Sequence, residues 1–228
     1  MTTYDAKDPR EVGLYTIGDA AHILGLAEST LSSWFRGRPY PTSQGIQKFA
    51  PVIEAASVQP LRLSFSNLVE AHVLKALRKK HRISLSKVRQ AIDYLSDQLG
   101  SARPLTEKLQ TDNINLFINH FGTLLNLTSH GQMAMKEILS AYLERIEWDV
   151  EGVSRGMYPF TSSSEQDPRI VWIDPRVSFG RPVIKGKGVP TRALAARYKA
   201  GDSIATLSED YDLTSREIEE AIRYELAA

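Results

Sequence analysis

The chain has 228 residues, of which 42% are hydrophobic and 24% are charged, and it contains no cysteine. This length suits two modest domains or one elaborated domain, and the composition is that of a folded protein. The lack of cysteine excludes disulfide frameworks, thiolate zinc sites, iron–sulfur clusters and cysteine nucleophiles. No run approaches about 18 apolar residues and the first residues carry no apolar segment, so we expect no membrane span, no signal peptide and a cytoplasmic location.

The charges are distributed unevenly, although the net charge is only +1. Residues 1–100 hold 13 Lys and Arg against 9 Asp and Glu, whereas residues 101–160 hold 5 against 7. Residues 169–199 hold eight basic residues and one acidic residue, and residues 200–228 hold two basic and eight acidic residues. This segregation predicts two surfaces of opposite sign and therefore two different partners.

The pattern of residues 14–38 is typical of two short helices around a turn. Thr16 followed by Asp19 approximates a capping box at the start of the first helix, and Gly25 is a usual residue at a helix end. A second helix follows at once over residues 28–35. This pattern of caps and apolar residues predicts a helix-turn-helix. Helix pairs of the same shape also occur as purely structural hairpins in proteins that never contact nucleic acid.

The remaining residues alternate between helical and irregular patterns. Pro, Gly and Ser in residues 38–65 predict a loop or β-hairpin. Apolar residues at helical spacing predict helices over 67–80, 84–99, 132–148, 191–200, 203–211 and 214–226. Short apolar runs predict strands within 105–128 and over 170–173 and 177–179, and a loss of periodicity predicts a linker over 154–169. The expected fold class is helix-rich α+β, with a winged helix-turn-helix, a central α+β segment and a small C-terminal trihelical unit preceded by short strands.

The second helix of the helix-turn-helix carries short hydroxyl groups and a guanidinium on the side opposite its apolar residues. Such groups can reach phosphates and base edges. Residues 78–82 add four cations in five positions, which suit either a solvated helix end or phosphate contacts. The candidate DNA-binding residues are Thr16, Ser29, Thr30, Ser32, Ser33, Arg36, Arg38, Arg78, Lys79 and Lys80.

The segment TIGDAAHILGLAESTLSSWF, followed by the wing candidate and two helices, resembles the DNA-binding domain of the MerR-type winged-helix regulators. The resemblance covers residues 13–99 and implies DNA binding through the second helix. A single helix-turn-helix buries too little surface for specific operator affinity, so we expect a homodimer. Its interface would use either the helix over 84–99 or the apolar stripe of the helix over 132–148.

The glycine-rich segment GRPVIKGKGVP is not a phosphate-binding loop of the Walker type. No glycine stands five residues before Gly186, and no Ser or Thr follows Lys187. The segment predicts a rigid turn whose cations face solvent. The last helix, over 214–226, has four Glu against two Arg, so it would be repelled by phosphates and suits protein binding better.

The block from residue 170 to residue 225 resembles a small antitoxin-associated domain of unknown function whose hallmark is a GRPVIKGTRIPV-like segment before a trihelical unit. Such domains are commonly encoded beside PIN-like ribonuclease toxins, so residues 168–228 are expected to dock a toxin, as in larger VapB-type antitoxins. PIN-like nucleases hold divalent metals with clustered carboxylates, and an inhibitor that covers such a site needs cations. The candidate toxin-binding residues are Arg181, Lys185, Lys187 and Arg192.

Catalysis finds little support in the sequence. The five histidines show no HxxxH or HExxH spacing, so we expect neither a metal site nor a catalytic constellation nor a cofactor. The leading hypothesis is a DNA-binding antitoxin that represses its own operon and neutralises a PIN-like ribonuclease. The alternative is a MerR-like regulator whose residues 101–228 sense a small ligand, and an enzyme fused to a DNA-binding head is a third, weaker hypothesis.

Overall fold

The two short helices expected near the start of the chain form a helix-turn-helix. The computed structural model describes residues 8–42, 45–79, 83–101, 103–106, 111–161 and 167–227. Helix α1 spans Ile17–Leu24 and α2 spans Glu28–Arg36. The predicted capping box is present, because the Thr16 hydroxyl accepts from the backbone N–H of Asp19, whose carboxylate accepts from the backbone N–H of Thr16. Gly25 then ends α1 in a left-handed conformation, with φ of 56°.

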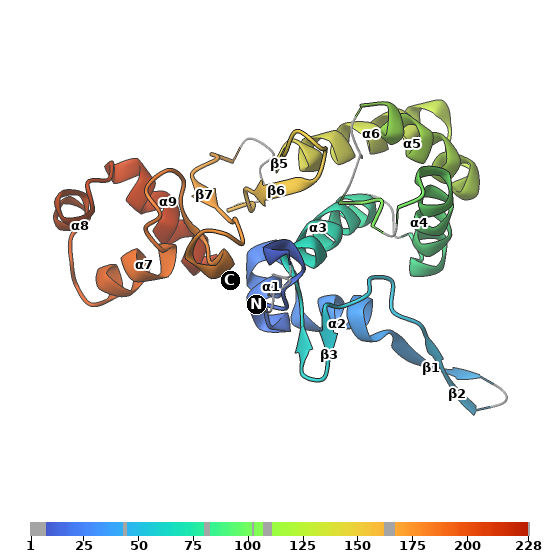
Figure 1. The fold of residues 1–228 in the computed structure, drawn as a ribbon, viewed down its shortest axis with the longest axis horizontal. Helices are drawn as coiled ribbons and strands as arrows, with labels where there is room; N and C mark the ends of the chain where they lie inside the picture. Colours follow the sequence, from blue (N-terminus) through green and yellow to red (C-terminus); the bar gives the residue numbers. More distant parts are fainter. Residues whose placement is uncertain are drawn as a thin grey trace, which may run out of the picture.

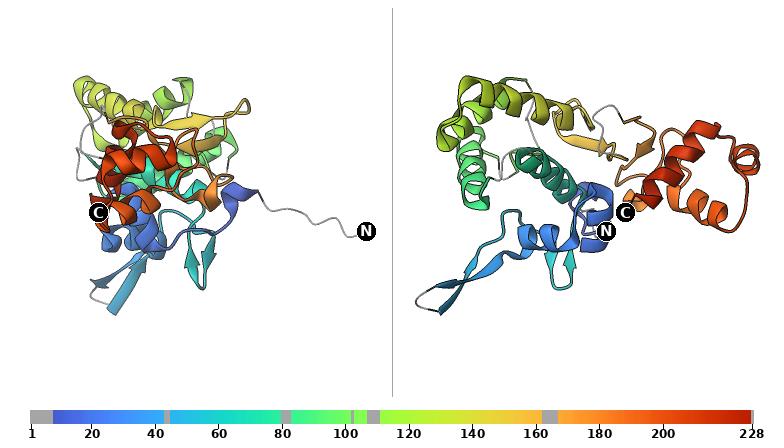
Figure 2. Two further views of the ribbon diagram at one scale, coloured as in Figure 1. Left: turned by 90° about the vertical axis from the view of Figure 1, so that its left-hand side faces the viewer. Right: turned by 180° about the vertical axis from the view of Figure 1, so that it is seen from behind.

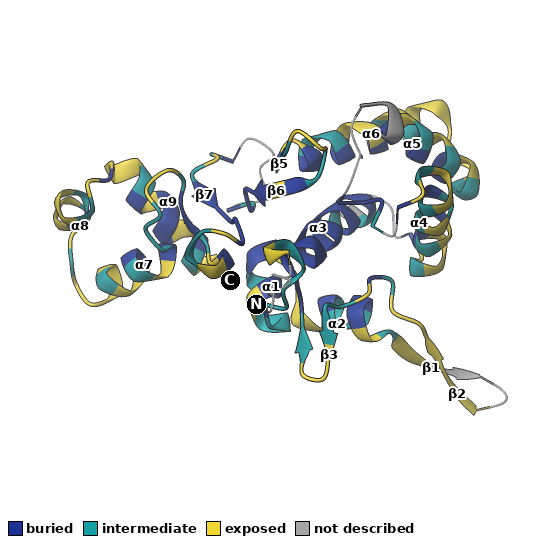
Figure 3. Ribbon diagram, in the orientation of Figure 1, coloured by how far each residue is buried: buried dark blue, intermediate teal, exposed yellow. Residues whose placement is uncertain are grey.

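Two β-hairpins occupy the segment between α2 and the next helix. Strand β1 (Arg38–Thr42) pairs antiparallel with β2 (Gly45–Phe49), and β3 (Ser57–Val58) pairs with β4 (Leu61–Arg62). The first hairpin extends away from the rest of the molecule (Figure 1), and every residue of β2 is exposed (Figure 3). The hairpin predicted within residues 38–65 is therefore confirmed, and it occupies the position of a wing beside the helix-turn-helix.

The next two helices agree with their predicted ranges. Helix α3 (Phe65–Lys79) runs through the middle of the molecule and is largely buried (Figure 3). Helix α4 (Leu85–Leu99) is capped by the Ser84 hydroxyl and ends at Gly100 in a left-handed conformation. Both apolar stripes thus fold as their 3.6-residue periodicity predicts.

The prediction of strands within residues 105–128 is wrong, because this segment contains helix α5 (Thr111–Leu125). The buried side chains of α5 are Ile114, Phe117, Ile118 and Phe121. Their spacing of three and four residues places them on one helical face, against α4 and α6. The apolar run over 114–118 is short and bounded by polar residues, and such a run alone does not separate a strand from a buried helix segment.

The predicted helix over 132–148 is found, but it is shifted toward the N-terminus. Helix α6 spans Ser129–Leu143, and strand β5 (Ile146–Trp148) follows it. Strand β5 pairs antiparallel with β6 (Ser154–Met157), so the linker predicted over 154–169 begins with a strand. Gly156 of this strand has a packing role, because a Cβ at this position would lie 2.1 Å from the Trp172 ring.

The three C-terminal helices fold as predicted, but the strands before them differ from the prediction. Strand β7 (Val171–Trp172) pairs antiparallel with β8 (Val183–Ile184), which lies inside the glycine-rich segment. The strand predicted over 177–179 is wrong, because Ser178, Phe179 and Gly180 all have positive φ and form a 3₁₀ turn. The remaining elements are the 3₁₀ turn Pro9–Glu11, α7 (Thr191–Lys199), α8 (Ile204–Tyr211) and α9 (Ser215–Leu226).

The buried apolar side chains form one large cluster and two small ones. The large cluster joins residues from Tyr15 to Ile173, so the helix-turn-helix and α3 to α6 share a continuous core. A second cluster lies among β8 and helices α7 to α9, and a third joins Tyr158, Trp172 and Val183 between the two. The C-terminal helices accordingly form a separate lobe beside the rest of the chain (Figures 1 and 2). Within the described residues, no helix has the length and apolarity that crossing a membrane requires.

Glu70 of α3 gives the fold a testable pH dependence. Its carboxylate accepts hydrogen bonds from Asn67 at 2.9 Å and from Arg103 at 2.7 Å. Burial nevertheless outweighs these contacts and raises the pKa of Glu70 to about 7. The folded chain therefore retains a proton that the unfolded chain releases at lower pH, so the stability due to Glu70 is lost as the pH rises toward 7.

Replacing Glu70 with glutamine should remove this pH dependence. Urea denaturation gives the free energy of unfolding of the wild type and of Glu70→Gln at each pH. The wild-type value minus the variant value should fall by about 2 kcal/mol as the pH rises from about 5 to 8. Glu137→Gln, at an exposed position of α6, is the matched control and should show no such change. A Glu70→Gln difference that stays constant or grows with pH would contradict the prediction.

Candidate nucleic-acid interface

Helix α2 presents its predicted polar face to solvent. Its apolar side chains Leu31, Trp34 and Phe35 are 0%, 1% and 5% exposed, respectively, and anchor the helix to the core. On the other side, Ser29 and Arg36 are exposed. The helix is therefore fixed by its apolar face and leaves hydroxyl and guanidinium groups available to a ligand.

A cleft of about 710 Å³ lies between α2, the base of the β1–β2 hairpin and the start of α4. Three arginines and five hydroxyl side chains line it, without any Asp or Glu among the lining residues. Its lining residues are Ser29, Thr30, Ser33, Gly37, Arg38, Phe49, Ala50, Arg78, Ile83, Ser84, Leu85, Ser86 and Arg89. A cleft with cations and hydroxyls but no carboxylate is suited to phosphate groups.

Arg89 is a cleft residue that the sequence analysis missed. Its guanidinium donates to the Ala50 carbonyl at 2.6 Å, just after the hairpin, while its Nε is buried without a hydrogen-bond partner. In the sequence, Arg89 is one polar position of an amphipathic helix, and only the tertiary fold places it beside the hairpin. Arg78, which was predicted, lies over the Trp34 ring with its Cζ 6.0 Å from the ring centroid.

The structure brings some of the predicted DNA-binding residues together and separates others. Ser29, Thr30, Ser33, Arg38 and Arg78 line the cleft, and the Ser33 hydroxyl donates to the Thr30 carbonyl at 2.7 Å.

Five other positions lie elsewhere or outside the described residues. Ser32 is half-buried on α2 and does not line the cleft. Arg36 is exposed at the end of α2 but does not line the cleft. The Thr16 hydroxyl caps α1 and donates to Asp19 at 2.6 Å. Lys80 and the side chain of Lys79 lie outside the described residues.

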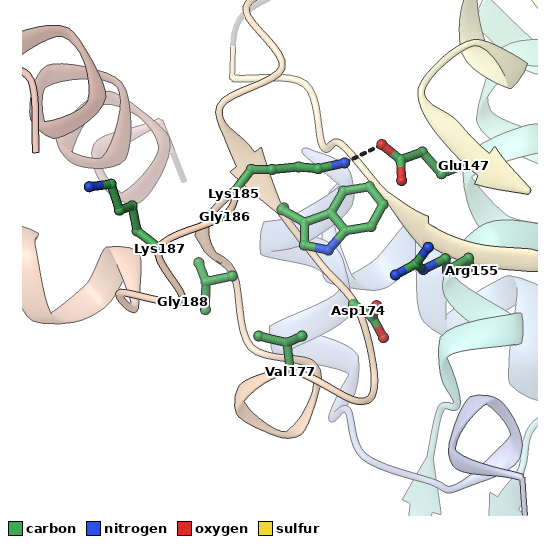
Figure 4. Close-up of a pocket in the computed structure, with 10 residues that line it drawn as sticks. Glu147, Arg155, Asp174, Val177, Lys185, Gly186, Lys187 and Gly188 are labelled. Atoms are coloured by element: carbon green, nitrogen blue, oxygen red, sulfur yellow. Dashed lines mark hydrogen bonds and ion pairs between the residues drawn. The ribbon is translucent and has the colours of Figure 1, made fainter.

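Two of the four predicted toxin-binding cations are held by contacts within the chain. The Lys185 ammonium lies 3.9 Å from the centroid of the Trp172 ring and is paired with Glu147 (Figure 4). The Lys187 ammonium lies 2.6 Å from a carboxylate oxygen of Asp212.

The other two cations, Arg181 and Arg192, are exposed. Neither forms an ion pair with a described residue. Of the four predicted toxin-binding cations, only these two have no carboxylate partner among the described residues and are therefore available to the carboxylates of another molecule.

A second cleft, of about 520 Å³, surrounds Lys185 (Figure 4). Its lining includes the Trp172 ring, Arg155 and Asp174, together with the turn that holds Gly186 and Gly188. Both glycines have positive φ, which agrees with the tight turn predicted for this segment.

The C-terminal lobe contacts the helix-turn-helix directly. The Tyr15 hydroxyl, just before α1, donates to the Gly180 carbonyl at 2.9 Å. The ring of His22 on α1 meets the ring of Tyr224 on α9 edge to face, with centroids 5.0 Å apart. Burial raises the pKa of both tyrosines, so their hydroxyls stay protonated.

Comparison with known proteins identifies matches at both ends of the chain. Residues 13–92 match a family described as "Putative DNA-binding HTH domain", and residues 171–224 match "Protein of unknown function (DUF433)". The chain is 26% identical over 229 residues to a Mycobacterium tuberculosis protein named "Putative antitoxin VapB45", with 93% of each chain covered. The crystal structure of Rv2018 from Mycobacterium tuberculosis superimposes with a TM-score of 0.68, at 21% identity, over 93% of this chain and 98% of that chain. The chain is thus similar over most of its length to a protein named as an antitoxin, and it contains a segment that matches a DNA-binding helix-turn-helix family.

Proposed function

We propose that the chain is an antitoxin that binds operator DNA through its helix-turn-helix and represses its own operon. The observation that carries this proposal is the cleft beside α2, where arginines and hydroxyls gather without a carboxylate. In this arrangement α2 enters the major groove, as in MerR-type regulators, and the β1–β2 hairpin follows the adjacent backbone. Arg38, Arg78 and Arg89 then contact phosphates, while Ser29 and Arg36 face the base edges.

The proposal extends to a protein partner and an assembly. The similarity to a protein named as an antitoxin supports a toxin partner, and a PIN-like ribonuclease remains the toxin class that the sequence resemblance implies. A homodimer would place two helix-turn-helix units on a two-fold symmetric operator. In this function the chain needs no cofactor and catalyses no reaction.

Removing the last arginine of α2 and the first of β1 tests the DNA-binding part of the proposal. Arg36→Ala should weaken binding to the DNA upstream of the operon by about 1–3 kcal/mol if Arg36 contacts a base. Arg38→Ala should instead lower the slope of log affinity against log salt by about one, as expected for one lost phosphate contact. Fluorescence anisotropy at several salt concentrations measures both effects.

A matched control is Arg216→Ala, because Arg216 is exposed on α9 in the other lobe. This variant should bind the operator with the affinity and salt slope of the wild type. If the double variant Arg36→Ala, Arg38→Ala binds as tightly as the wild type, α2 is not the DNA-binding helix.

A second function is favoured by the cleft around Lys185. The Trp172 ring and the side chains of both charges that line this cleft would suit a small polar ligand, as in a regulator whose C-terminal half senses a metabolite. The protein encoded by the adjacent gene separates the two functions. An antitoxin should copurify with this protein and relieve its toxicity on co-expression, whereas a ligand-sensing regulator should do neither.

A further inference from the structure

The turn before β8 holds an aromatic side chain out in solvent. Phe179 is 82% exposed and has φ of 56°, between Ser178 at 49° and Gly180 at 73°. A left-handed backbone is unfavourable for a bulky residue and persists only where its surroundings fix it. The surroundings do so here, because Gly180 donates to the Val177 carbonyl at 2.9 Å and accepts from the buried Tyr15 hydroxyl.

Most cations of this region are neutralised within the chain. Five of the eight basic residues of 169–199 form ion pairs with carboxylates: Arg169, Arg176, Lys185, Lys187 and Arg197. The other three, Arg181, Arg192 and Lys199, are exposed and have no carboxylate partner among the described residues. The positive charge that this region can offer to another molecule is concentrated on these three side chains.

These cations and Phe179 belong to one part of the fold. Arg192, Ala196 and Lys199 are all exposed and recur at helical spacing on the solvent face of α7, whose opposite face packs on α9. The backbone N–H of Thr191 donates to the Pro182 carbonyl at 3.1 Å, which brings the start of α7 next to Arg181. We define the Phe179 surface as the side chains of Phe179, Arg181, Arg192 and Lys199.

We propose that the Phe179 surface docks an acidic protein partner, with Phe179 entering an apolar pocket and the three cations meeting carboxylates around that pocket. This proposal rests on the antitoxin function above, and the partner is then the toxin. Aromatic and Arg side chains dominate the binding energy of protein interfaces. Because the backbone of the turn is already fixed by the contacts of Gly180, binding needs to order only the side chain of Phe179, which lowers the entropic cost. A nucleic acid would explain the cations but not the fixed display of a phenyl ring.

Replacing Phe179 with glycine separates binding from folding. Glycine tolerates positive φ, so the melting temperature of Phe179→Gly should not fall below that of the wild type. Its affinity for the protein encoded by the adjacent gene, measured by calorimetry with the full chain, should fall at least tenfold. Val150→Ser removes a different, fully exposed apolar side chain, from the turn between β5 and β6, and should leave this affinity unchanged. Wild-type affinity in Phe179→Gly would overturn the proposal.

Charge reversal on α7 tests the cationic part. The double variant Arg192→Glu, Lys199→Glu should weaken partner binding at least tenfold, while Arg216→Glu on α9 should not.

Both Phe179-surface variants should keep wild-type affinity for operator DNA. Loss of DNA affinity instead of partner affinity would show that this surface binds nucleic acid. If the wild-type chain fails to bind the adjacent gene's protein, the antitoxin function fails as well. If the wild type binds and the variants bind equally well, only the Phe179 surface is wrong.

Discussion

Replacing Arg145 with methionine should lower the free energy of unfolding by about 3 kcal/mol or more. The side chain is 2% exposed, and its guanidinium donates to the carbonyls of Tyr158, Pro159 and Asp167. It also lies over the Phe160 ring, with Cζ 4.6 Å from the centroid. Methionine fills much of the volume but leaves three carbonyls without their donor, so the connection from α6 to the C-terminal lobe loses its main polar support.

Urea denaturation measures this effect, and Arg169→Met is the matched control. Arg169 is half exposed and pairs with the exposed Glu144, so its loss should change the free energy of unfolding by less than about 0.5 kcal/mol. Equal effects of the two substitutions would show that the three carbonyl contacts contribute little to stability.

Gly37→Ala should lower the free energy of unfolding by about 2 kcal/mol and weaken operator binding at least tenfold. Gly37 joins α2 to β1 with φ of 72° and ψ of −179°, a conformation that is essentially restricted to glycine. A Cβ at this position would lie 1.9 Å from the backbone oxygen of Phe49. The hairpin must therefore shift relative to α2, and the cleft between them changes shape.

Gly100→Ala provides the comparison for Gly37→Ala. Gly100 also has positive φ, at 60°, but a Cβ there would have no neighbour within 4 Å. This variant should lose about 1 kcal/mol of stability from backbone strain alone and should bind DNA normally. Thermal denaturation and anisotropy on both variants check the prediction, which fails if Gly37→Ala retains the DNA affinity of Gly100→Ala.

The strong local signals in the sequence were sufficient for much of the fold. The capping box at Thr16 and the apolar stripes of α3 and α4 identified these helices because periodicity and capping are local properties. Helix α5 was missed because the apolar run over 114–118 is too short to separate a strand from a buried helix segment. Strand β6 was missed because residues 154–157 show no apolar periodicity, and the close packing of Gly156 on Trp172 joins residues distant in sequence.

The sequence predicts the part of each candidate site that consists of exposed side chains on a single helix. The polar face of α2 follows directly from helical geometry, whereas the position of Arg89 beside the hairpin requires the tertiary fold. Charge counting could not distinguish Lys185, which is paired with Glu147, from Arg181, which has no described carboxylate partner. Nor could it identify Phe179, because its exposure depends on the left-handed turn.

The contact between the two lobes determines which variants are informative. Ile173 and Met157, both fully buried, exchange backbone hydrogen bonds, and the Tyr15 hydroxyl is bonded to Gly180. Deleting residues 165–228 would therefore expose part of the main core and disturb the start of α1. Point substitutions on the surface separate the two binding activities without this damage.

In the proposed function, operator DNA and a protein partner bind to different faces of the same chain. Measuring both affinities for two variants of the full chain separates these faces. The first variant is Arg36→Ala, Arg38→Ala at the junction of α2 and β1, and the second is Phe179→Gly with Arg192→Glu on the Phe179 surface. The first variant should lose operator affinity and keep the affinity of the wild type for the adjacent gene's protein, and the second should do the reverse. Loss of both affinities in either folded variant, or loss of neither in both, would contradict this assignment of faces.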